Sequence, residues 1–71
     1  MITADYEIVI EGELAEPVAL SFRPLQVIYR DGTTVIRATQ VDQAALHGIL
    51  SRLSNLGLTL LRVEAQPPVT H

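Results

Sequence analysis

Three polar side chains recur at four-residue spacing in the second half of the sequence: Gln43, His47 and Ser51. This spacing places them on one face of a helix, where His47 could exchange a proton with Ser51 or bind a metal ion. A metal site needs further ligands, and neither a histidine nor a carboxylate stands three or four residues after His47. We retain the trio as a candidate polar site, and we predict no metal and no cofactor.

Catalysis would require more than this helix face offers. A serine nucleophile needs a pocket, oxyanion donors and shielding from water, which a solvent-facing helix surface lacks. Glu11 and Glu13 stand two residues apart on a predicted strand and share a face, whereas acid–base catalysis needs opposed carboxyl groups around a substrate. Gly12 and Gly32 fit no phosphate-binding loop. We therefore predict no catalytic residue and a protein that is not an enzyme.

The first part of the chain predicts a strand and a connection. Residues 6–14 alternate in polarity, with Tyr6, Ile8 and Ile10 on one face, which is typical of a strand with one buried side. Residues 15–24 have prolines near both ends, which favours a connection, either a short turn of helix or an edge strand.

A β-hairpin is the clearest local signal. Residues 25–30 and 33–40 flank Asp31-Gly32, a dipeptide that suits a type I′ turn because both central residues need positive φ. A two-residue loop fixes the cross-strand pairs, and paired residues share a face. One face is predicted to enter the core, and it carries Leu25, Val27, Tyr29, Ile36 and Ala38.

A helix and a last strand follow the hairpin. Asp42 is a suitable N-cap and Gly57 a suitable C-cap. Between them an apolar stripe recurs at three- and four-residue steps: Leu46, Ile49, Leu50, Leu53 and Leu56. Gly48 in mid-helix suggests a close approach to a sheet or a second helix. Residues 58–65 predict the last strand, and the tail 67–71 is expected to be frayed.

These elements predict an α+β domain of two layers in the order β-β-β-α-β. A right-handed crossover would make the last strand parallel to the third. We expect a four-stranded mixed sheet with one long helix packed on one face. The pattern leaves open whether the last strand pairs with the first or the third. The whole chain, 1–71, is expected to be one small domain with its ordered core at about residues 5–66.

Size, charge and composition restrict the partners. A chain of 71 residues without cysteine has few ways to stabilise a small core, which favours a homo-oligomer, most simply a dimer. The net charge of −3 argues against nucleic acid. No uninterrupted apolar run exceeds three residues, so we expect no membrane segment and no signal peptide, and a cytoplasmic location.

The segments 32–36 (GTTVI), 42–50 (DQAALHGIL) and 56–58 (LGL) resemble a known group of sequences. They are similar to small uncharacterised bacterial proteins of actinobacterial type, which share a DGTTVL hairpin and a DQAALHGLL helix. The similarity extends over about residues 6–65. The group has no assigned activity, so the resemblance implies the order of the elements and supplies no chemistry.

The sheet face that the helix leaves open is the most informative surface. It should combine an apolar centre with a charged rim, as many protein interfaces do. The candidate interface residues are Val9, Ile28, Arg30, Val35, Arg37, Leu60 and Arg62. Five of the acidic residues precede position 17 and all arginines follow it, so Glu7 and Glu11 could pair with Arg30, Arg37 or Arg62.

The leading hypothesis is a non-catalytic protein–protein interaction or regulatory module that self-associates through the open sheet face or an exposed edge strand. In a variant of this hypothesis, the partner is a different protein. The alternative is a small-molecule-binding or enzymatic homodimer with its site at the subunit interface. RNA binding ranks last because the only aromatic side chain of the hairpin, Tyr29, is predicted to face the core, which leaves no stacking platform.

Overall fold

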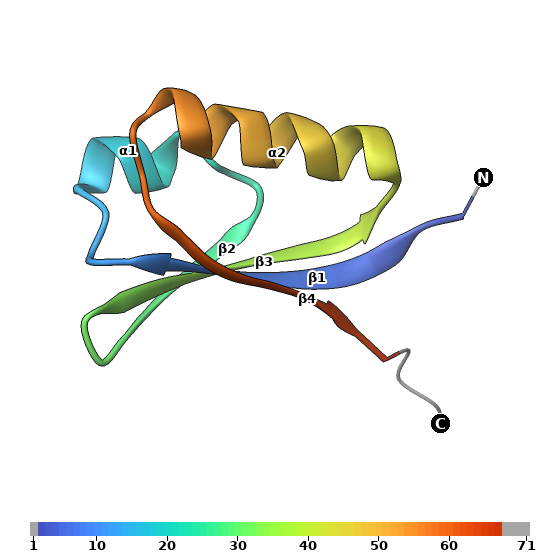
Figure 1. Ribbon diagram of the computed structural model, residues 1–71, viewed down its shortest axis with the longest axis horizontal. Coiled ribbons are helices and arrows are strands. Elements are labelled where there is room, and N and C mark those ends of the chain that lie inside the picture. Colours follow the sequence, from blue (N-terminus) through green and yellow to red (C-terminus); the bar gives the residue numbers. More distant parts are fainter. Residues whose placement is uncertain (1, 68–71) are drawn as a thin grey trace.

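The alternating segments form four strands, with two helices on one side of them, in a computed structural model that describes residues 2–67 (Figure 1). The elements are β1 (Ala4–Glu11), α1 (Glu16–Leu20), β2 (Gln26–Arg30), β3 (Thr33–Val41), α2 (Gln43–Asn55) and β4 (Leu60–Gln66). The α+β class and the long helix on one sheet face are confirmed. Most of the tail that was expected to fray, 68–71, lies outside the described residues.

The hairpin register is confirmed at every predicted pair. Ile28 lies opposite Val35, and the pairing continues from Arg30–Thr33 at the turn to Gln26–Arg37 at the far end. Asp31 and Gly32 both have positive φ, at 52° and 78°. These are the values that a type I′ turn needs, and its twist matches the twist of the flanking strands.

The sheet is antiparallel throughout, so the expectation of a mixed sheet is wrong. The strand order is β2-β3-β1-β4, and β4 pairs with β1 rather than with β3. β4 does run parallel to β3, as a crossover through α2 requires, but β1 lies between them and is antiparallel to both. The element and strand order is that of the split β-α-β, or ferredoxin-like, arrangement with a very short first helix.

The core lies between the sheet and the helices. Ile8, Ile10 and Ile36 are fully buried from the sheet side, and Leu46 and Leu53 meet them from α2. Tyr6, Val27, Ile49 and Leu50 pack around this cluster, as predicted. Leu56 is the exception in the helix stripe, because it remains half-exposed at the end of α2.

Both ends of α2 have the predicted caps. The Asp42 carboxylate accepts a hydrogen bond of 2.7 Å from the backbone N–H of Ala45. At the other end, the N–H of Gly57 donates to the carbonyl of Ser54 and the N–H of Leu58 donates to that of Leu53. This pair of bonds is a Schellman motif, and it requires the positive φ of 74° that Gly57 adopts.

The connection between β1 and β2 contains α1, the short helical turn that was one of its two expected forms. Two of its apolar side chains, Leu14 and Phe22, enter the core. Leu14 was expected within the first strand, which instead ends at Glu11, and no periodic pattern marked Phe22. Thr34 fixes the entrance to this connection. Its buried hydroxyl accepts a hydrogen bond from the N–H of Leu14 at 3.3 Å and donates one to the carbonyl of Gly12 at 2.7 Å.

Candidate functional site: an open sheet face, a free strand edge and a groove

The open face of the sheet is organised in rows that cross the strands. The central row contains Ile28, Val35, Val9 and Arg62, one residue from each strand in the order β2-β3-β1-β4. A charged row stands on one side of it, with Gln26, Arg37, Glu7 and Glu64. On the other side stand Arg30, Thr33 and Glu11.

The apolar centre of this face is smaller than expected. Val35 is only 2% exposed and Val9 only 9%, although no helix covers them. We attribute their burial to the long side chains of the neighbouring rows, whose aliphatic stems can lie along apolar surface. Of the three apolar residues in the row, Ile28 alone is partly accessible, so this face offers little apolar area to a partner.

Leu60 does not extend the apolar row. The register between β1 and β4 slips by one residue after Val9, so Leu60 lies opposite Ile10, which belongs to the helix-facing side. Such a bulge places two residues opposite one and turns side chains away from the regular alternation. Leu60 and the neighbouring Leu61 are 46% and 52% exposed at the start of β4.

A small ion network crosses the open face. Arg37 Nε lies 3.4 Å from Glu7 Oε2, and Arg62 Nη2 lies 4.0 Å from Glu7 Oε1. Arg62 Nε also lies 3.9 Å from Glu64 Oε2. The expected pairing of Glu7 with Arg37 and Arg62 is therefore observed, whereas no ion pair among the described residues includes Glu11 or Arg30.

β4 is an edge strand with a free side. Among residues 2–67 it pairs only with β1, along one side, and every residue in it is exposed or partly exposed. Figure 1 shows it at the margin of the sheet, where the chain descends from α2. A free edge presents unpaired backbone N–H and C=O groups, which can template pairing with another strand.

The candidate polar site lies on the exposed side of α2. Gln43, His47 and Ser51 are all exposed, and no side-chain hydrogen bond joins them. Within residues 2–67, no group of three or more histidine, cysteine, aspartate or glutamate side chains could hold a metal ion. Gln43, His47 and Ser51 therefore form a polar stripe that faces solvent.

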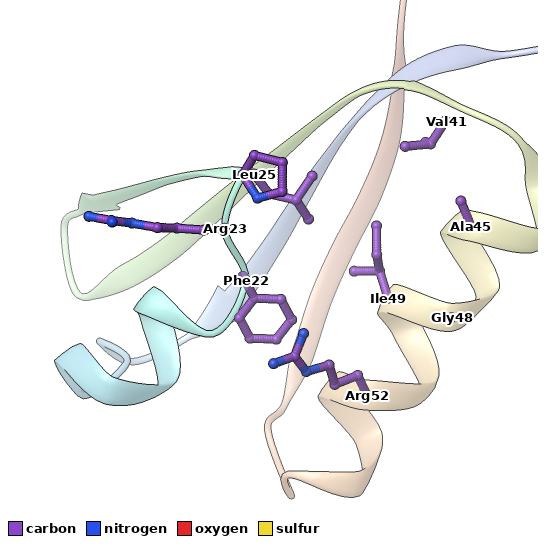
Figure 2. Close-up of a pocket in the computed structure, with 9 residues that line it drawn as sticks. Phe22, Arg23, Leu25, Val41, Ala45, Gly48, Ile49 and Arg52 are labelled. Atoms are coloured by element: carbon purple, nitrogen blue, oxygen red, sulfur yellow. The ribbon is translucent and has the colours of Figure 1, made fainter.

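A groove that the sequence analysis missed lies between the 22–25 segment and α2. It has a volume of about 360 Å³ and is lined by Phe22, Arg23, Pro24, Leu25, Val41, Ala45, Gly48, Ile49 and Arg52. In Figure 2 the Arg52 guanidinium stands beside the Phe22 ring at one end, whereas Arg23 points away from α2. The Arg52 Cζ atom is 4.5 Å from the ring centroid, a cation–π distance.

The expected close approach at Gly48 is not present. A Cβ atom on Gly48 would meet no heavy atom within 4 Å, because the residue faces the open groove. The sequence did contain a signal for the groove, since Gly48 and Arg52 are four residues apart and share a helix face. The second wall comes from the irregular segment around Phe22, which has no periodicity to read.

Comparisons with known proteins supply a family and no activity. Residues 5–64 match the model of a family described as Domain of unknown function (DUF8691). No curated protein and no solved structure matches the chain. Within the described residues, no helix is long and apolar enough to cross a membrane.

Proposed function

The chain belongs to the DUF8691 family, which brings no activity with it, and we propose that it is a non-catalytic interaction module in which two copies pair through the free edges of their β4 strands. We place this module in the cytoplasm of a bacterium of actinobacterial type. The open sheet face, the other predicted route to a dimer, has less support because Val9 and Val35 are already shielded.

One observation carries the proposal: opposite charges flank the midpoint of β4. The strand extends from Leu60 to Gln66, so its central residue is Val63, and Arg62 and Glu64 stand on either side of it. Both charged side chains lie on the open face, since they pair with Val9 and Glu7 of β1. Neither enters the core, so packing does not account for them.

Symmetry restricts how two β4 strands can pair. An antiparallel pair related by a two-fold axis perpendicular to the sheet must place a residue opposite its own copy, because cross-strand partners share a face. An axis at Val63 places Val63 opposite its own copy and keeps the regular residues beside it on shared faces, whereas Leu60 and Leu61 lie at the bulge, where the alternation is broken. The same axis places Arg62 opposite Glu64 of the second copy, twice.

The neighbouring registers are electrostatically worse. An axis at Arg62 sets two arginines directly opposite each other, and an axis at Glu64 does the same with two glutamates. Like charges at facing positions destabilise a strand pair, whereas opposite charges contribute roughly 0.2–1 kcal/mol each. Charge therefore selects the register about Val63.

The intramolecular arrangement also benefits from a second copy. Glu7 and Glu64 are directly opposite each other on β1 and β4, and Arg62 lies near both carboxylates, diagonal to Glu7 and two residues before Glu64 on the same strand. In the proposed dimer, Arg62 of the second copy stands directly opposite Glu64 on its free side. The row across the junction then reads Arg37, Glu7, Glu64 and Arg62 of the second copy, in which both flanking positions are cationic.

The half-exposed Leu60 and Leu61 add apolar area beside the junction. A single pair of strand edges is smaller than a standard interface of about 1,600 Å², so we expect a dimer that dissociates in the micromolar range. A different protein with an extended segment could add to the same edge by the same backbone pairing.

The test is the solution mass by light scattering over a range that reaches low micromolar concentration. The native protein should approach the mass of a dimer at high concentration, and Arg62→Glu and Glu64→Arg should each remain monomeric. Arg30→Glu is the matched control, because Arg30 is an exposed arginine on the opposite edge strand. A native chain that stays monomeric, or a dimer that survives both β4 substitutions, would contradict the proposal.

A further inference from the structure

We propose that the groove between the 22–25 segment and α2 binds a small molecule with an apolar body and a carboxylate group, and that Arg52 pairs with the carboxylate. This site lies within one subunit, so it does not depend on the pairing of β4 strands.

The first observation is the empty space at Gly48. Glycine inside a helix costs about 1 kcal/mol relative to alanine, and here neither a positive φ nor a close neighbour requires it. An alanine would fit without contact to the protein, and a larger side chain would project into the groove. The absence of a side chain therefore keeps one wall of the groove open.

The second observation is the charge of Arg52. Its guanidinium lies over the ring of Phe22, a residue that is itself buried, so the cation is held at the end of the groove. None of the ion pairs among residues 2–67 includes Arg52. A guanidinium that lies over an aromatic ring keeps the N–H donors of its own plane available, and a carboxylate can accept two parallel hydrogen bonds from them.

The third observation is the chemistry of the walls. Apart from the two arginines the lining is apolar, with Pro24, Leu25, Val41 and Ile49 among its side chains. The volume of about 360 Å³ is at the lower end of the range for small-molecule sites. Since Arg23 points away from α2 in Figure 2, Arg52 is the one cation directed at the groove among the labelled residues. This combination matches a short aliphatic or aromatic carboxylate.

Two carboxylates, octanoate and 3-phenylpropionate, are suitable probes, and octanamide is the neutral match of the first. Backbone amide spectra of the 15N-labelled protein report where each probe binds. We expect at least one carboxylate to shift the amide signals of Phe22, Arg23, Leu25 and residues 41–52. If octanoate binds, octanamide should bind at least tenfold more weakly than octanoate.

Two variants test the named residues. Arg52→Gln removes the charge at similar length and should weaken carboxylate binding about tenfold, which corresponds to about 1.4 kcal/mol. Gly48→Leu should abolish binding by filling the groove, while the helix remains at least as stable, because leucine is a better helix former than glycine. The inference is overturned if neither carboxylate binds the native protein, if octanamide binds as well as a bound octanoate, or if the folded Gly48→Leu protein binds unchanged.

Discussion

Glu7 of β1 and Glu64 of β4 face each other directly across the antiparallel pair, and the Arg62 side chain contacts both. Two carboxylates at facing positions repel each other unless cations stand close by. Arg37 approaches Glu7 from β3, at 3.4 Å, but among residues 2–67 no strand pairs with β4 on the side away from β1. Glu7 is thus paired with arginines of both neighbouring strands, whereas Glu64, at the edge of the sheet, is paired among the described residues only with Arg62 of its own strand.

Glu7→Gln should lower the free energy of unfolding by about 0.5–1 kcal/mol, since Arg37 and Arg62 would lose the negative charge that they share. The value stays in the range for surface ion pairs because Arg37 and Arg62 are both well exposed. Urea denaturation measures the change. The difference in stability between the native protein and the variant should shrink in about 0.5 M salt, where the Debye length is only a few ångströms. Glu11→Gln, on the same strand and face, is the control and should have little effect.

Thr34→Val should destabilise the fold by roughly 1–3 kcal/mol, because it removes a hydroxyl that serves two buried or part-buried backbone groups without changing the shape of the side chain. The N–H of Leu14 and the carbonyl of Gly12 would lose their partner. Thr34→Ser keeps the hydroxyl and should retain most of that hydrogen-bonding contribution. Equal stability of the valine and serine variants in thermal denaturation would refute this role of the hydroxyl.

Two glycines of the α2 region should respond in opposite directions to the same substitution. Gly48→Ala should raise the free energy of unfolding by about 1 kcal/mol, since alanine favours helix and meets no neighbour there. Gly57→Ala should lower the free energy of unfolding by about 1 kcal/mol, because φ at this position is +74°. Chemical denaturation of the two variants side by side separates the effects, and a loss of stability in the first would show that Gly48 has a structural role.

The order of the elements, the hairpin register and both caps of α2 could be read from the sequence because each depends on local rules. Alternation marks a strand, Asp31-Gly32 specifies the turn, and Gly57 marks the end of the helix. The position of β4 could not be read from the sequence, since a strand that runs parallel to β3 can pair with either β1 or β3. Only the packing of the whole sheet puts β1 between β3 and β4.

The candidate surface was predicted in part. Most residues of the open face follow from the alternation of the strands, and the pairing of Glu7 with Arg37 and Arg62 is one of the combinations that it allowed. The burial of Val9 and Val35 does not follow from the alternation, which places both residues on the open face. The bulge that displaces Leu60 and the groove wall around Phe22 arise where the backbone departs from regular geometry, so periodicity predicts neither of them.

The register of the proposed dimer can be tested most directly by mixing two variants, Arg62→Glu and Glu64→Arg. Each alone sets like charges opposite each other across the two-fold axis at Val63. In the mixture, both cross-strand contacts join an acidic position of one chain to a basic position of the other. Native mass spectrometry of the mixture, with one variant isotopically labelled, should show a heterodimer although each variant alone is a monomer. Two variants that remain monomeric when mixed, from a native protein that dimerises, would contradict pairing of β4 strands about Val63.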